Sequence, residues 1–214
     1  MERKSKIEYL LPEEIEKRSF EIITEELKKK GISLPAEQEN ITKRVIHTSA
    51  DFDYADTLVY SKDAVAIAKE LLINGADIVT DTNMALAGIN KKALAKLGGQ
   101  THCFMADEDV ARLAKERGVT RAVVSMEKAR NIEKPVIFAV GNAPTALIRL
   151  YEMIQEGNWH PAFVIGVPVG FVNVEVAKEL IMETEVPYIV NRGRKGGSNV
   201  AAAICNALLY ELTR

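Results

Sequence analysis

The sequence predicts an α/β protein of three layers, with a central, mostly parallel β-sheet, helices on both faces of the sheet and an N-terminal helical addition. The first observation is a set of short apolar runs, rich in β-branched residues and bounded by Gly, Asn, Asp or Pro. Such runs are typical of strands buried on both faces. The second is that helical segments separate these runs, which indicates right-handed crossovers and a parallel sheet. The predicted strands are residues 77–80, 136–140, 162–167 and 187–190, with residues 101–105 as a weaker fifth.

Two helices are expected before the first of these strands. Residues 13–30 carry glutamates early and three lysines late, followed by Gly31, in agreement with the helix dipole and with C-terminal signals. Residues 36–48 have helical apolar spacing and place Arg44 and His47 on one face, three residues apart. These helices form the N-terminal addition.

Composition indicates one globular domain, residues 1–214, because no linker, repeat or compositional shift divides the chain. A net charge of −2 argues against general nucleic-acid binding. No segment approaches the roughly 20 apolar residues of a membrane helix, and Glu8 interrupts the only apolar run near the start, so neither a membrane span nor a secretory signal is expected. Cys103 and Cys205 lack disulfide or metal-ligand spacing, which favours the reducing cytoplasm.

Ligands of open parallel sheets bind beyond the carboxyl ends of the strands, and three loops occupy that position. Residues 141–146 follow one strand and offer Asn142 as a helix N-cap. Residues 166–172 follow the next strand, where Gly170 permits close backbone approach to a flat ligand. From the residues alone, a capped helix start explains the first loop better than a ligand site does, and a tight turn explains the second better.

The third loop combines three cations and three glycines just before the last helix, which are the components of an anion site. Its candidate binding residues are Arg192, Arg194, Gly196 and Ser198. A solvated basic loop is the alternative interpretation. Because neither G-x-x-x-x-G-K-[ST] nor G-x-G-x-x-G occurs, phosphate or carboxylate ligands are favoured over a nucleotide.

His47 is the best candidate for proton transfer among three histidines. Arg44 shares its helical face and would pair with an acidic ligand, leaving the imidazole available near neutral pH. His102 and His160 fit packing or surface roles better. No cluster has metal-ligand spacing, so no metal site is predicted.

Five motifs in this order resemble the precorrin-8X methylmutase family, including its cobalt-precorrin-8 form, over nearly the full length. They are Glu16-Lys17-Arg18-Ser19-Phe20-Glu21-Ile22-Ile23, Arg44-Val45-Ile46-His47-Thr48, Gly141-Asn142-Ala143-Pro144-Thr145-Ala146-Leu147, Gly166-Val167-Pro168-Val169-Gly170-Phe171-Val172 and Arg192-Gly193-Arg194-Lys195-Gly196-Gly197-Ser198. The resemblance implies an isomerase of cobalamin biosynthesis that moves a methyl group from carbon 11 to carbon 12 of a corrin ring and needs no cofactor. It also implies a homodimer with active sites near the interface.

The resemblance assigns the family's catalytic histidine, its proton donor and acceptor, to His47. It assigns substrate contacts to Ser19, Arg44 and Arg121. A corrinoid acid is a large ring bearing many carboxylates, so it needs apolar area and several cations. The expected substrate-binding residues are Ser19, Arg44, Arg121, Asn142, Gly170, Arg192, Arg194, Gly196 and Ser198. The alternative is a non-catalytic protein that binds a corrinoid or another anionic metabolite; the presence of His47 argues against a carrier, which needs no proton donor.

Overall fold

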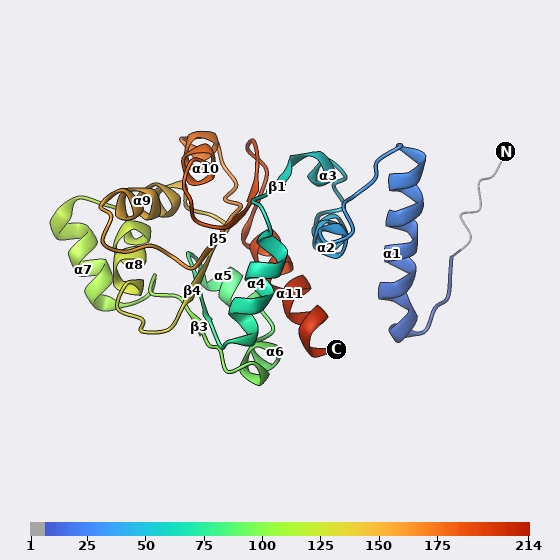
Figure 1. Cartoon of the computed structure of the whole chain (residues 1–214), viewed down its shortest axis with the longest axis horizontal. Helices are drawn as coiled ribbons and strands as arrows, with labels where there is room; N and C mark the ends of the chain where they lie inside the picture. Colours follow the sequence, from blue (N-terminus) through green and yellow to red (C-terminus); the bar gives the residue numbers. More distant parts are fainter. Residues whose placement is uncertain (1–6) are drawn as a thin grey trace.

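The computed structural model describes residues 7–214 of the predicted domain, and it has three layers with a sheet in the middle (Figure 1). Within these residues, six strands form one sheet in the order β1-β6-β5-β4-β2-β3. The strands are β1 Leu58–Tyr60, β2 Asp77–Thr80, β3 Thr101–His102, β4 Val136–Val140, β5 Phe163–Gly166 and β6 Tyr188–Asn191. β1 runs antiparallel to β6, and every other neighbouring pair is parallel. The predicted fold class is confirmed.

Alternate residues of the strands face opposite helical layers, as the two-residue period of a strand requires. On β4, Ile137 and Ala139 belong to one apolar cluster, whereas Val136, Phe138 and Val140 belong to the other. The helices on the first side are α4 Ala64–Ile73, α5 Asn83–Gly88, α6 Lys91–Lys96 and α11 Ser198–Thr213; on the second they are α8 Arg121–Ala129, α9 Pro144–Gln155 and α10 Val174–Met182, with α7 Glu108–Arg117 packed on α8. Both faces of the parallel strands are therefore covered.

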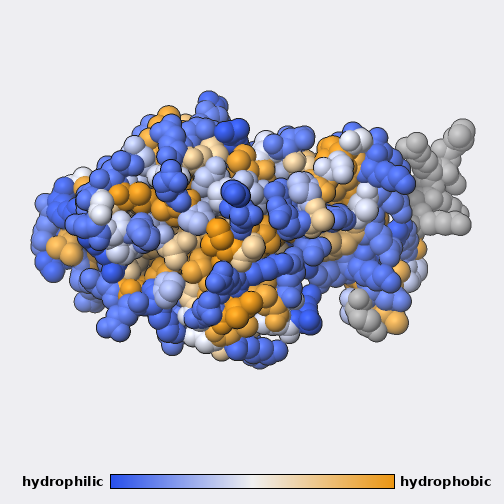
Figure 2. Space-filling model, in the orientation of Figure 1, coloured by the Kyte–Doolittle hydropathy of each residue, from blue (hydrophilic) through white to orange (hydrophobic). Residues whose placement is uncertain are grey.

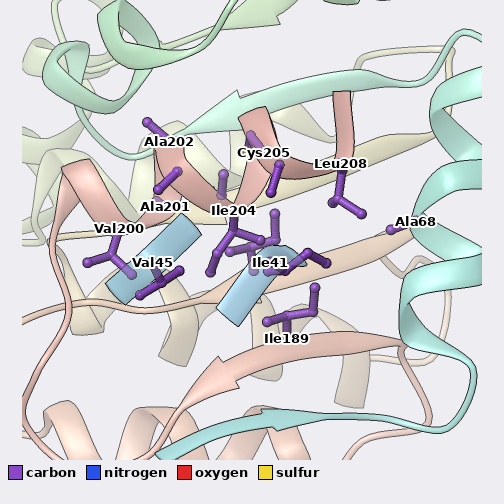
Figure 3. Close-up of a cluster of buried hydrophobic side chains, with 14 of the residues drawn as sticks. Ile41, Val45, Ala68, Ile189, Val200, Ala201, Ala202, Ile204, Cys205 and Leu208 are labelled. Carbon is purple, nitrogen blue, oxygen red and sulfur yellow. The ribbon is translucent and has the colours of Figure 1, made fainter. Parts of the chain in front are cut away.

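The N-terminal addition packs on the first layer through α11. Its helices are α1 Pro12–Lys29, α2 Glu39–Ser49 and the short α3 Tyr54–Thr57. Ile41 and Val45 of α2 are fully buried among side chains of α11, including Val200 and Ile204 (Figure 3). α1 packs against α2 at the outer end of the molecule (Figure 1). α2 is thus wedged between a buried helix and an outer one.

The predicted strands at residues 77–80 and 136–140 are correct in every residue. The prediction for residues 162–167 is one residue too long at each end, that for residues 187–190 is displaced by one, and only two residues of 101–105 pair as a strand. The second helix begins at Glu39 rather than residue 36, because residues 36–38 form a turn. β1 was not predicted, since three residues are too few to show a periodic pattern. None of the helices within residues 7–214 is long and apolar enough to cross a membrane.

Candidate functional site

His47 lies on the last turn of α2 and lines a pocket of about 280 Å³ between α2, α5 and α11. Arg44, one turn earlier on α2, lines the same pocket, as do Asn206 and Tyr210 of α11. The imidazole is solvent-exposed, and its ring centre lies 5.5 Å from that of Phe20 on α1. The predicted pairing of Arg44 with His47 in one site is therefore present in the structure.

Small residues and a fixed amide shape the opposite wall of this pocket. A Cβ atom at Gly88, the last residue of α5, would lie only 2.8 Å from the Cβ of Ala202, so α5 and α11 approach closely there. The Asn206 side chain accepts a hydrogen bond from the amide of Asn90 and donates one to the carbonyl of Gly88, both at 2.8 Å. The wall is consequently rigid, and its polar group is already oriented.

Arg44 is held in place by aromatic rings and by an ion pair. Its guanidinium lies 4.8 Å from the ring centre of Phe20 and 5.3 Å from that of Tyr210. It also donates a hydrogen bond to the carboxylate of Glu16 on α1. Stacking on two rings and a carboxylate partner restrict a guanidinium strongly. Arg44 therefore joins α1, α2 and α11 while it borders the His47 pocket.

Glu16 is the acidic member of this cluster. Partial burial acts to raise its pKa, but the hydrogen bond and charge of Arg44, helped by the charge of Arg214, hold that pKa below its ordinary value. The Arg214 guanidinium lies 3.5 Å from the same carboxylate and stacks 3.6 Å from the ring centre of Tyr210. Glu16 thus stays ionised at neutral pH and balances two arginines.

Ser19 and Arg121 lie away from the His47 pocket. The Ser19 hydroxyl donates a hydrogen bond to the carbonyl of Ile15, one turn back on α1, at 2.9 Å. Arg121 is the exposed first residue of α8, and its N-cap Thr120 contacts the hydroxyl of Thr145 at the start of α9 at 3.0 Å. Arg121 therefore lies near the carboxyl end of β4, on the side of the sheet opposite α2.

Asn142 is presented by a loop that the buried carboxylate of Asp81 organises. Asp81 directly follows β2 and accepts hydrogen bonds from the amides of Gly141, Asn142 and Ala143 at 2.8, 2.8 and 2.6 Å. Burial raises the pKa of Asp81, and the three amides oppose that rise. The prediction of Asn142 as N-cap is wrong: Ala143 holds that position, because Asp81 already satisfies these amides. The carboxylate of Asp81 therefore already occupies the position at which these three amides could bind an anionic ligand.

The loops after β4, β5 and β6 pack tightly on one another at the carboxyl end of the sheet. A Cβ atom at Gly141 would lie 2.7 Å from Cα of Ser198, and one at Gly196 would lie 2.1 Å from the carbonyl oxygen of Val167. The hydroxyl of Ser198 is buried and bonds to that of Thr82, the N-cap of α5, at 2.7 Å. Gly141, Gly196 and Ser198 therefore serve close packing here.

Arg192 and Arg194 extend from the last of these loops into solvent, with 58% and 59% of their side chains exposed. The amide of Gly170 donates a hydrogen bond to the carbonyl of Arg194 at 3.2 Å. This bond joins the loop after β5 to the basic loop after β6, residues 192–197. Lys195 instead forms ion pairs with Asp51 and Asp53 in the connection from α2 to α3. The predicted residues thus do not form one site: Arg44 and His47 line one pocket, Arg192 and Arg194 lie on an exposed basic loop, and Ser19 and Arg121 belong to neither.

Two buried polar residues of this region were not identified from the sequence. Asp81 had a recognisable signal, because it stands at the carboxyl end of a predicted strand. Lys178 is fully buried on α10, on the face shared by Val174 and Ile181. A lysine within an apolar helical stripe is a signal of a buried, paired cation.

The fold and the pocket define an α/β protein with a pocket, bordered by Arg44 and His47, between its N-terminal addition and the helices of the first layer. Residues 14–211 match the family model described as precorrin-8X methylmutase. The cobalt-precorrin-8 methylmutase of Salmonella typhimurium is 45% identical over 206 residues, covering 94% of this chain and 96% of that protein. The precorrin-8X methylmutase of Pseudomonas aeruginosa is 39% identical over 199 residues, covering 92% of this chain and 94% of that protein.

A solved structure agrees with these sequence matches. The crystal structure of precorrin-8X methylmutase from Thermus thermophilus superposes with a TM-score of 0.83 at 36% identity, covering 92% of this chain and 96% of that one. The chain belongs to the precorrin-8X methylmutase family, and it is an enzyme of the isomerase class, a methylmutase.

Proposed function

We propose that this methylmutase acts in cobalamin biosynthesis and moves a methyl group from carbon 11 to carbon 12 of precorrin-8 or its cobalt form, giving hydrogenobyrinate or cobyrinate. The bond from carbon 11 to the methyl group breaks and the bond to carbon 12 forms, so no atom is gained or lost and no co-substrate is consumed. The observation on which this proposal rests is the placement of His47 and Arg44 in one pocket of a family member.

His47 would act as proton donor and acceptor. Its imidazole is exposed to the pocket, and it stands on the last turn of α2, one turn after Arg44. A proton placed on the conjugated ring would stabilise charge that develops as the methyl group shifts, and the imidazole would then recover it. Arg44, held between Phe20 and Tyr210, keeps the edge of the pocket in position. Because the reaction is intramolecular, correct positioning supplies much of the remaining acceleration.

We further propose a homodimer in the cytoplasm. Ile15 and Ile22, with 53% and 39% of their surface exposed, lie two turns apart on one face of α1, with Ser19 between them. Figure 2 shows small hydrophobic patches within a mainly hydrophilic surface at the end of the molecule that α1 occupies. Exposed apolar surface of this kind favours a partner, and a second subunit there would bring Ser19 near the interface. Cys103 and Cys205 are both free thiols, which fits a reducing compartment.

The test of the catalytic role compares turnover of precorrin-8 or cobalt-precorrin-8 by the wild type and by the His47→Ala variant. Loss of a general acid–base group typically costs about 10²–10⁴-fold in rate, so a fall of at least a hundredfold is expected. His160→Ala is the matched control, because His160 lies at the opposite end of the sheet, before β5. Full turnover by the His47→Ala variant would exclude the proton role.

Binding is tested separately by titrating the protein with cobyrinic acid and following its visible absorption spectrum. The wild type and the His47→Ala variant should both show saturable binding, whereas a simple polycarboxylate should not compete. If nothing binds, or the polycarboxylate binds equally well, the corrinoid substrate is wrong and a generic anion-binding protein becomes the better interpretation.

A further inference from the structure

The basic loop, residues 192–197, has three of its backbone carbonyls turned toward the protein interior. The ammonium of Lys178 donates to the carbonyl oxygens of Gly193 and Lys195 at 2.7 and 2.9 Å. The side-chain amide of Asn191 donates to those of Arg192 and Lys195 at 3.1 and 2.8 Å. Lys178 and Asn191 are both fully buried. Two interior donors therefore hold three carbonyl groups of one short loop.

This arrangement turns three amides of the basic loop outward. The described chain contains no cis peptide bond, and in a planar trans peptide the N–H points opposite to the C=O of the same unit. The amides of Gly193, Arg194 and Gly196 follow the three inward carbonyls, so they point away from Lys178. Within residues 7–214 no backbone or side-chain acceptor bonds to these three amides. A Cβ atom at Gly193 would meet nothing within 4 Å, so the loop borders open space there.

Two cations flank these amides. Within residues 7–214, Arg192 forms an exposed ion pair with Glu179 at 3.3 Å, and Arg194 forms one with Glu175 at 3.5 Å. Exposed pairs of this kind are weak and are readily exchanged for another anion. Successive outward amides with adjacent arginines form the kind of concave group that binds carboxylates and phosphates.

Apolar surface adjoins the loop. The guanidinium of Arg194 lies 5.6 Å from the ring centre of Phe171, whose surface is 82% exposed, and neighbouring Val172 is 78% exposed. The hydrogen bond from Gly170 to the Arg194 carbonyl fixes this apolar segment against the basic loop. A ligand with both a carboxylate and a large apolar body fits these two neighbouring surfaces better than a free phosphate does.

We propose that the basic loop binds one side-chain carboxylate of the corrinoid, and that buried Lys178 is the positioning residue that keeps its amides turned outward. This inference rests on the proposed function, because that function supplies the carboxylate-bearing ligand. Lys178 does not touch the ligand; it acts through the carbonyls that it binds. Burial lowers the pKa of Lys178 to about 8, against the charge of Glu175, so at neutral pH it remains an ammonium with three donors.

The experiment measures the affinity of the Lys178→Met variant for two corrinoids: cobyrinic acid, and a derivative whose side-chain carboxylates are all amides. Methionine has a similar length but no donor, so it should keep the packing of α10 while releasing the carbonyls of Gly193 and Lys195. We expect a loss of about tenfold for cobyrinic acid, or about 1.4 kcal/mol, and less than about twofold for the amide derivative. Lys69→Met is the control, because it removes an ion pair with Glu211 outside the loop.

A second variant tests the same proposal in case Lys178→Met does not fold. Arg194→Gln changes only an exposed side chain and should weaken cobyrinic acid binding severalfold, again with little effect on the amide derivative. In the wild type, cobyrinic acid should shift the amide NMR signals of Gly193, Arg194 and Gly196.

The outcomes separate this proposal from the proposed function. If the wild type binds cobyrinic acid but neither variant weakens it, or both corrinoids lose affinity equally, the carboxylate site is wrong while the proposed function stands. If the wild type does not bind cobyrinic acid, both are overturned.

Discussion

Replacing Asp81 with Asn tests whether one buried carboxylate organises the loop that presents Asn142. Asp81 accepts three amide hydrogen bonds, from residues 141–143, and its surface is fully buried. The amide oxygen of asparagine can replace one carboxylate oxygen, but its NH₂ group then faces a backbone N–H, donor against donor. The Asp81→Asn variant keeps the shape of the side chain but removes its charge and its ability to accept at both ends.

The expected loss follows from these contacts. A buried donor without a partner costs about 1–3 kcal/mol, and the other two bonds weaken when their acceptor loses its charge. Removing a buried charge offsets part of this, because burial already disfavours the ionised form of Asp81. The net loss should be about 2–3 kcal/mol, which for a chain of this length lowers the melting temperature by about 4–12 °C.

Thermal unfolding followed by circular dichroism at pH 7 measures this change. Asp56→Asn is the matched control, because Asp56 is exposed on α3, and its melting temperature should stay within about 2 °C of the wild type. Equal melting temperatures for Asp81→Asn and the wild type would refute the reasoning, since the loop amides would then find partners without the carboxylate.

Two further variants test an ion pair and a close packing contact: Glu16→Gln, and Gly141→Ala with its own control. Because the pKa of Glu16 is lowered, its ion pair should stabilise the fold above the ordinary value of 4.5 and lose that effect as the pH falls through the lowered pKa. Glu16→Gln should thus reduce the free energy of unfolding at pH 7 by about 1 kcal/mol or less, and in thermal unfolding its difference from the wild type should shrink as the pH falls below 4.5. Gly141→Ala should destabilise by about 1–3 kcal/mol in urea titrations, because its Cβ would lie 2.7 Å from Cα of Ser198 and 2.8 Å from the oxygen of Gly197. Asn142→Ala, the exposed neighbour, should change stability by less than about 0.5 kcal/mol, and equal effects of these two variants would contradict the packing argument.

Local pattern was sufficient for the buried parallel strands and for the order of the layers. The strand at residues 136–140 is apolar throughout because both of its faces are covered by helices. Its burial could therefore be predicted from its own residues. The pairing of Arg44 with His47 was also predictable, because helical periodicity alone places residues three apart on one face. Such features depend on neighbours within one turn or one strand.

The tertiary structure decided which polar groups remain available to a ligand. Lys195 and Arg194 look alike in the sequence, yet Lys195 pairs with two aspartates across the α2–α3 connection while Arg194 stays at the surface. The amides before α9 look like an anion site, yet Asp81, 60 residues earlier than Gly141, already fills it. These outcomes depend on contacts between segments far apart in the chain, and no local period encodes them. Short-range periodicity therefore determined the elements, and local motifs the candidate residues, whereas long-range pairing of charged and polar groups determined which of those residues face the solvent and which face each other.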